Sequence, residues 1–195
     1  SGGTVVTDVN SSNLTYIRNT TISGGGAIYI NGRAQGSNIT VNSNGLLELN
    51  TQGNLYDSTV NDGGQLIVHS GLLSHLTLNS GATAVIDEGY FYTPLNHDPV
   101  ALDINRGAVC IISSGGMGRS VNVAGNLQIM GQLESLGTQK EMDQLNLTLE
   151  VESLEPDNTV ALVDGFKYLP QEVTNCTISI ASTMEEGEYL LATNI

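Results

Sequence analysis

The chain of 195 residues has no tryptophan and only two phenylalanines, and aromatic residues make up 5% of it. This scarcity excludes a core built on large aromatic side chains, so the fold must bury aliphatic ones. No run of 18 apolar residues occurs, which excludes a membrane-spanning helix. The opening letters, "SGGTVV", carry no signal-peptide pattern and are expected to belong to a mature fragment.

Positive charge is also scarce, because 6 Lys and Arg residues stand against 20 Asp and Glu residues, for a net charge of −14. Nucleic acid binding needs a basic surface to neutralise phosphates, so the composition argues against a nucleic acid partner. The same deficit argues against anionic membranes and polyanionic substrates. An acidic, self-repelling surface is the simplest interpretation of the charge.

Only two cysteines occur, Cys110 and Cys176, which is too few for a disulfide framework. The sequence leaves open whether they form one disulfide or remain two free thiols. No motif calls for a cofactor, and we expect none.

What the chain has in excess is glycine, 23 residues of 195, together with many asparagines. Both residue types tolerate left-handed backbone conformations and favour tight turns. Between the turns lie short runs of Val, Ile and Leu, which favour strands. The composition therefore predicts an all-β protein with frequent turns.

A repeat of about 19 residues organises residues 1–131. A glycine precedes an alternating apolar pair in each unit, as in "GAIYI", "GLLEL" and "GQLIV". These anchor glycines, expected to be structural corners, are Gly26, Gly45, Gly64, Gly81, Gly107 and Gly125. A second short strand precedes each anchor. Such a unit cannot bury its apolar face alone but can do so when it is stacked on its neighbours.

The repeat predicts a right-handed parallel β-helix, a solenoid of about six coils of roughly 19 residues, each advancing about 4.8 Å. The second and fourth residues after each anchor are expected to point inward. By that rule Thr83 and Val85 point inward and Ala84 outward, and likewise Val109 and Ile111 inward and Cys110 outward.

The stretch "SGGGAIYINGRAQGSNITVNSNGLLELNTQGNLYDSTVNDGGQLIVHSG" resembles the AIDA-type repeats of autotransporter adhesin passengers, which alternate "TV-x-x-GG-x-x-x-V" with small polar corners. The resemblance covers roughly residues 1–131. It implies a β-helical stalk that is secreted or displayed on a bacterial cell surface and that serves adhesion or self-association. Some members of that family carry sugars on Ser or Thr.

After about Leu133 the period is lost. Alternating stretches such as "QLNLTLEV" and "NCTISIAS" are separated by polar or proline-containing connectors. We therefore expect antiparallel strands there, and a division into a β-helix domain, 1–131, and a C-terminal antiparallel capping module, 132–195.

The best candidate for a binding site is an insertion, "DEGYFYTPLNHDPVALD" at 87–103, which lengthens one repeat to 26 residues. Loops that leave a solenoid commonly carry recognition, and clustered aromatics suit contacts with sugars or proteins. The alternative is a loop whose aromatics pack on the side of the solenoid. The residues expected to bind ligand are Tyr90, Phe91, Tyr92, His97 and Asp98.

Other motifs favour structure over chemistry. Gly63 and Gly64 precede a strand and no Gly-Lys-Ser/Thr, so they indicate a corner and not a phosphate loop. "GGMGRS" at 115–120 has Ser120 where a calcium-binding nonapeptide repeat needs Asp. His69 and His75 are expected to be solvent-exposed, and no metal site is predicted.

The function expected from the sequence is a non-catalytic, adhesin-like stalk that binds host glycan, matrix or a copy of itself through a rigid, multivalent face. The alternatives are a polysaccharide lyase or hydrolase built on a β-helix, and a spacer without a ligand. The enzyme alternative is weakened because the repeats show no stacked outward carboxylates.

Overall fold

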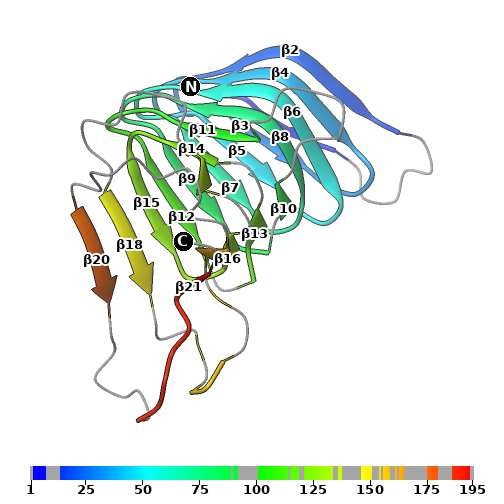
Figure 1. Ribbon diagram of the computed structural model, residues 1–195. Helices are drawn as coiled ribbons and strands as arrows, with labels where there is room; N and C mark the ends of the chain where they lie inside the picture. Colours follow the sequence, from blue (N-terminus) through cyan, green and yellow to red (C-terminus); the bar gives the residue numbers. More distant parts are fainter. Residues whose placement is uncertain are drawn as a thin grey trace.

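A computed structural model places the backbone of much of the chain in two parallel β-sheets (Figure 1). It describes residues 2–7, 14–88, 90–91, 101–113, 115–118, 121–133, 136–137, 146–150, 154, 156–158, 161, 163–164, 175–179 and 186–193. The strands are β1 Thr4–Val6, β2 Tyr16–Ile22, β3 Ala27–Ile30, β4 Gln35–Val41, β5 Leu46–Leu49, β6 Gly53–Val60, β7 Gln65–Val68, β8 Gly71–Leu78, β9 Thr83–Ile86, β10 Tyr90–Phe91, β11 Leu102–Ile104, β12 Val109–Ile112, β13 Met117–Gly118, β14 Val121–Val123, β15 Asn126–Ile129, β16 Gln132–Leu133, β17 Leu136–Gly137, β18 Asn146–Glu150, β19 Val163–Asp164, β20 Asn175–Ser179 and β21 Ala192–Thr193.

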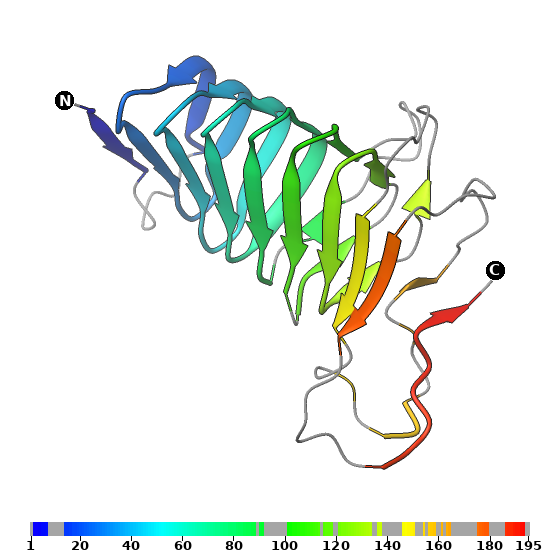
Figure 2. The same cartoon turned by 90° about the vertical axis from the view of Figure 1, so that its left-hand side faces the viewer.

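Every strand pairs with the equivalent strand of the coil before and after it, and every described pairing is parallel. The first sheet, sheet A, has nine strands in the order β1-β3-β5-β7-β9-β12-β15-β18-β20. The second, sheet B, has 12 strands and begins β2-β4-β6-β8. The coils follow one another along a single axis from the N-terminal end (Figure 2).

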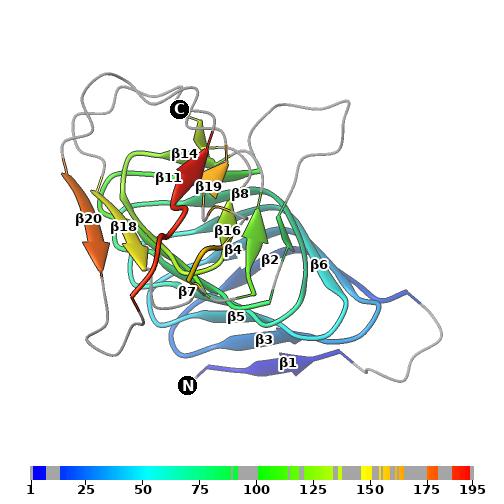
Figure 3. The ribbon, with the colours of Figure 1, turned by 60° about the horizontal axis from the view of Figure 1, so that its bottom comes forward.

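One coil consists of β4, a corner, β5, a second corner and then β6, which already lies on β4. Strands β1, β3, β5 and β7 accordingly lie one above the next (Figure 3). The predicted parallel β-solenoid is confirmed, with about six turns. Its hand stays a prediction.

The core is a set of aliphatic columns that run along the axis. One column consists of the last inward residue of each sheet A strand from β3 to β18, and its members are at most 4% exposed: Ile30, Leu49, Val68, Ile86, Ile112, Ile129 and Leu149. Each such side chain contributes about 1.5–3 kcal/mol relative to an exposed position. The chain therefore needs no tryptophan, because each coil buries its apolar face on the next.

Sheet B bends sharply once per coil, at a residue in the left-handed conformation. These residues are Asn19, Asn38, Asp57 and His75, whose φ angles are 51°, 52°, 48° and 54°. Asn and Asp tolerate this conformation better than most residues. We call this the bend corner; it divides sheet B into two flat faces and gives the coil a third side.

The corner between sheet B and sheet A is held by side-chain amides. Each asparagine donates from Nδ2 to Oδ1 of the asparagine one coil earlier, at 2.7–2.8 Å: Asn61 to Asn42, Asn79 to Asn61, and Asn105 to Asn79. We call this column the asparagine ladder. It satisfies polar groups at half-buried positions and ties successive coils together.

The six anchor glycines all lie in this corner, between a strand of sheet B and the next strand of sheet A. The predicted alignment of two of them is wrong by one residue. The Gly64 amide donates to Asn61 O at 2.8 Å, and the equivalent bond, at 2.9 Å, comes from Ala82 and not from Gly81. Gly81 instead adopts a φ of 77°, as Gly63 does at 67°.

The one-residue shift reverses the faces of two strands, because side chains alternate along a strand. Ala84 and Cys110 are completely buried, whereas Val85 and Ile111 face outward and are half-buried. The expectation that Val85 and Ile111 are core residues is therefore wrong.

The antiparallel C-terminal cap is also wrong for the strands that the structure describes. β18 pairs in parallel with β15 and β20, and β19 pairs in parallel with β16 and β21. These strands extend the solenoid sheets beyond residue 131 (Figure 2). The domain boundary at 131/132 stays a prediction.

The corrected register can be tested with two neighbouring substitutions. Replacing Ala84 by Asn places an unpartnered amide in the core and should lower the free energy of unfolding by several kcal/mol. Val85→Asn faces outward and should cost less than about 1 kcal/mol. Urea unfolding followed by circular dichroism measures the free energy of unfolding of both variants. A larger loss in Val85→Asn than in Ala84→Asn would instead support the register expected from the glycine spacing.

Candidate functional site

The insertion leaves the solenoid at the bend corner. Strand β8 has two partners on its far side: Tyr90 and Phe91 of β10 pair with its first half, and β11 pairs with its second half from Leu76 onward. Between them β8 has only Ser74 and His75, whereas ten residues, 92–101, separate Phe91 from Leu102 in the sequence. Both halves of β8 therefore pair with a strand of the next coil.

The return of the insertion to the sheet is firmly anchored. Ala101 and Leu102 are completely buried, and the Leu76 amide donates to Ala101 O at 3.0 Å. Beyond this point sheet B continues as two branches, one through β13 and one through β14.

Of the five predicted ligand-binding residues, Tyr90 and Phe91 lie in β10, and Tyr92, His97 and Asp98 lie outside the described residues. The register separates the two residues of β10. Phe91 aligns in the strand register with Leu73 and Gly118, which are both buried.

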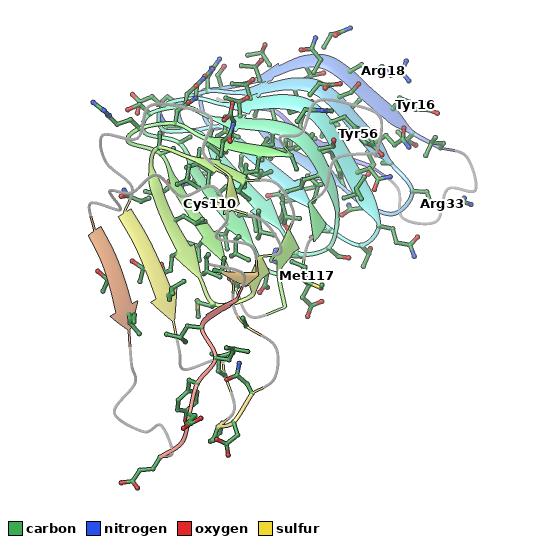
Figure 4. All side chains as sticks on the ribbon, viewed as in Figure 1. Tyr16, Arg18, Arg33, Tyr56, Cys110 and Met117 are labelled. Carbon is green, nitrogen blue, oxygen red and sulfur yellow. The ribbon has the colours of Figure 1, made fainter. Side chains whose placement is uncertain are left out.

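Tyr90 aligns instead with Leu72 and Met117, of which Met117 is 39% exposed and projects from the surface (Figure 4).

The bend corner next to the insertion carries polar side chains that contact each other from coil to coil. Asn38 Nδ2 donates to Asn19 Oδ1 at 2.6 Å. In the next two coils the amides are replaced by a carboxylate and an imidazole, with Asp57 Oδ1 3.4 Å from His75 Nδ1. His75 is the last member of the column before the insertion.

The corner after sheet A has the same arrangement. Asn50 Nδ2 donates to Asn31 Oδ1 at 2.7 Å. The next residue in this column, His69, lies between two carboxylates, with Nε2 3.7 Å from Glu48 Oε1 and Nδ1 3.7 Å from Asp87 Oδ2. Asp87 is the first residue of the insertion.

Both histidines are partly exposed, as expected, but sequence reasoning missed their carboxylate partners. The side chain of His69 is 49% exposed and that of His75 is 30% exposed. The partners lie about one repeat away in sequence. The signal that would have found them is the repeat itself, once the coils are aligned residue by residue.

Arg18 stacks on an aromatic ring: its guanidinium carbon lies 4.3 Å from the centre of the Tyr16 ring on β2 (Figure 4). Tyr16 is 50% exposed. In the part of the chain that the structure describes, neither Arg18 nor Arg33 is in ion-pair distance of a carboxylate. This outer face of sheet B thus combines an aromatic ring, a cation and the polar bend corner.

Gly63 and Gly64 form a corner, as predicted. Gly63 is left-handed, and a Cβ on Gly64 would lie 2.6 Å from Val41 O of the preceding coil. Among the described residues no three His, Cys, Asp or Glu side chains are grouped to hold a metal ion, and no helix is long and apolar enough to cross a membrane.

Cys110 is a free, completely buried thiol inside the coil (Figure 4). Burial raises its pKa to about 12. Cys176 belongs to the same register column three strands further on, so the two Cα atoms are roughly 14 Å apart. That separation is beyond the reach of a disulfide, which spans at most about 7 Å.

No family model matches the chain, and no curated protein matches it. Among solved structures it is similar to the crystal structure of a hyper-glycosylated fragment of TibA, whose glycosylation is catalysed by TibC. The likeness covers 83% of this chain and 76% of that one, with 17% sequence identity and a TM-score of 0.44. The fold assigned above rests on the strand pairing of the chain itself.

The register of β10 predicts different effects of two substitutions. Phe91→Ala should lower the free energy of unfolding by about 3 kcal/mol or more, because the residues that align with Phe91, Leu73 and Gly118, are buried. Tyr90→Ala should change it by less than about 1 kcal/mol. Chemical denaturation of both variants measures these changes. Equal losses of unfolding free energy would contradict the different environments expected for the two residues.

The buried thiol predicts a loss of stability in alkali. The pKa of Cys110 is raised from 9.0 to about 12 in the folded protein. The protonated thiol therefore contributes fully to the free energy of unfolding below pH 9, and this contribution is lost as the pH rises from 9 to 12. Each pH unit in that range costs about 1.4 kcal/mol. Cys110→Ala should remove this slope in unfolding measured between pH 8 and 11, and an unchanged slope would contradict the assignment.

Proposed function

We propose that this chain is a non-catalytic, adhesin-like β-solenoid, secreted or displayed on a bacterial surface, that binds host glycan or matrix or a copy of itself. The insertion 87–103 carries the specific contact. Two lines support the proposal: the resemblance of the repeats to AIDA-type adhesin passengers, and the way in which the solenoid presents the insertion.

The observation that carries the proposal is the fork at β8. Both described ends of the insertion, in β10 and in β11, pair with β8, so its two ends are held at fixed places on the sheet. A recognition loop held on rigid strands loses little conformational freedom at its roots when it binds. An insertion that served only to fill space would have no need of an intact sheet on both sides.

The surface around the fork suits an uncharged or weakly charged ligand. Leu72 and Met117 border the Tyr90 position on the outer face of sheet B, and Asn38 and Ser37 follow on the same face in an earlier coil. Apolar and aromatic groups beside amide and hydroxyl groups are typical of carbohydrate and protein contacts.

A carbohydrate-active enzyme is the alternative of a different class. Glycoside hydrolysis needs two carboxylates that face one substrate across a cleft. Glu48 and Asp87 approach each other from different coils, but His69 lies between them. A panel of neutral and acidic polysaccharides, assayed for reducing ends and unsaturated products, tests this alternative, and any turnover would favour it over the proposal.

The adhesive role predicts that adherence depends on the tyrosines of the insertion. The double variant Tyr90→Ala/Tyr92→Ala should reduce adherence of protein-coated beads to host cells or matrix at least tenfold, with the β-sheet circular dichroism and melting temperature unchanged. It leaves in place Phe91, which aligns with the buried Leu73 and Gly118.

A matched control is Tyr29→Ala, which removes a half-buried, outward tyrosine from sheet A, away from the fork. Its adherence should equal that of the unmodified chain. Full adherence of the Tyr90/Tyr92 variant would exclude these tyrosines as the contact. If the unmodified chain does not adhere either, the alternative of a spacer without a ligand is favoured.

A further inference from the structure

Three neighbouring strands of sheet B present a small polar surface on their outer side, before the bend corner. We call it the β2–β6 face. The register places its outward side chains in two columns across three coils, and all are half-buried or exposed: Tyr16, Gln35 and Asn54 in one column, and Arg18, Ser37 and Tyr56 in the other. Neighbours within a column are about 4.8 Å apart, and the two columns are about 6.6 Å apart.

Arg18 gives this face a positive charge that the rest of the chain does not neutralise. The sequence has 6 Lys and Arg residues against 20 Asp and Glu residues. Yet in the part of the chain that the structure describes, no carboxylate lies in ion-pair distance of Arg18. Asp57, which follows Tyr56, is instead paired along its own column, with Oδ1 3.4 Å from His75 Nδ1. The Arg18 guanidinium is therefore available to an anion from outside the chain.

The Tyr16 ring holds the cation on the outer surface. The guanidinium carbon of Arg18 lies 4.3 Å from the centre of this ring, which belongs to a residue that is 50% exposed (Figure 4). A guanidinium that lies over an aromatic ring is attracted by the ring and keeps N–H donors at its edge. Those donors match the two oxygens of a carboxylate, which they can bind as a parallel pair of hydrogen bonds.

The backbone around Arg18 is held as well. The next residue, Asn19, adopts the left-handed bend with a φ of 51°, and the Thr20 hydroxyl donates to Arg18 O at 3.0 Å. Strand β2 pairs with β4 on both sides of this bend. A cation fixed in this way loses little conformational freedom when it binds a ligand.

The rest of the β2–β6 face suits a sugar better than a peptide. Beside Tyr16 and Arg18, the next coil presents the amide of Gln35 and the hydroxyl of Ser37, and Tyr56 supplies a second aromatic side chain one coil further on. Sugars stack on aromatic rings and exchange hydrogen bonds with amides and hydroxyls. None of the six outward residues is aliphatic, so the face offers no apolar anchor of the kind that a peptide side chain requires.

The charge of the whole chain limits the ligand to few negative groups. A net charge of −14 repels a polymer that carries an anion on every unit. The face itself has one arginine, which matches one carboxylate.

We propose that the β2–β6 face binds a glycan that ends in a sugar with a single carboxylate, of the sialic acid type. Arg18 binds the carboxylate, Tyr16 contacts the sugar ring, and the side chains of Gln35 and Ser37 bind hydroxyl groups. The inference rests on the proposed function only in taking a glycan as the ligand. It adds the chemical class of that glycan and a second contact surface, apart from the insertion.

Titration of the isotope-labelled whole chain with 3′-sialyllactose and with lactose, followed by amide chemical shifts, tests the proposal. The two sugars share the lactose unit and differ in the acidic sugar. The Kd for 3′-sialyllactose should be at least tenfold lower, because charge-assisted hydrogen bonds to the carboxylate are lost with lactose. The shifts should fall on β2, β4 and β6 and leave β15 unchanged, and the preference should weaken as salt is added.

Three variants and a matched control locate the site. Arg18→Gln and Tyr16→Ala should each reduce the preference for 3′-sialyllactose to less than about threefold, whereas Tyr16→Phe keeps the ring and should keep the preference. Arg106→Gln makes the same change of charge at an exposed arginine after β11 and should also keep it.

The same titrations define the results that would overturn the proposal. Equal or absent binding of the two sugars by the unmodified chain would do so. So would a preference that survives Arg18→Gln or Tyr16→Ala, or one that is lost in Tyr16→Phe or Arg106→Gln. A short glutamate peptide that binds as tightly at the same residues would show that the face recognises a carboxylate without the sugar.

Adherence measured in parallel separates this proposal from the adhesive function. A preference for 3′-sialyllactose that depends on Arg18, in a chain that adheres to neither cells nor matrix, would refute the adhesive function and leave the site standing. Adherence that requires Tyr90 and Tyr92, without any preference for the acidic sugar, would refute the site alone.

Discussion

The structure depends on one constraint, the parallel, in-register stacking of each coil on the one before. Every coil must supply a residue that fits each core column and a residue that tolerates each corner, or the stacking on both neighbours is lost. The column from Ile30 to Leu149 and the asparagine ladder are two results of this constraint. They explain why a chain with so few aromatic residues can bury a continuous core.

The same constraint determines where variation is possible. A residue inserted within a strand would shift all following core residues to the outer face. The bend corner is different, because the backbone there already leaves the strand conformation and Ser58 accepts the hydrogen bond of the Ile39 amide in place of a backbone carbonyl. A long insertion at this corner costs mainly loop-closure entropy, which grows slowly with length. The proposed recognition site therefore lies at a corner where the fold tolerates insertions.

The repeat made most of the solenoid predictable from the sequence, because its glycine spacing and alternating apolar residues recur with a period close to one coil. It misled at Gly81 and Gly107, where Ala82 and Ala108 occupy the position that glycine holds in earlier coils. It also misled after Leu133, because alternation is the same in parallel and antiparallel strands and only the pairing distinguishes them. The insertion was visible as a break in the period. The partners of His69 and His75 were not, since ion pairs between coils require the exact register.

The central claim is that the insertion is an excursion from a complete coil and that recognition resides in it. The most direct measurement replaces residues 92–100 by a single serine, which together with the retained, buried Ala101 supplies the two residues needed opposite Ser74 and His75. We predict a protein whose free energy of unfolding is within about 1 kcal/mol of the original and that no longer adheres. A protein that fails to fold, or one that folds and still adheres, would contradict the account.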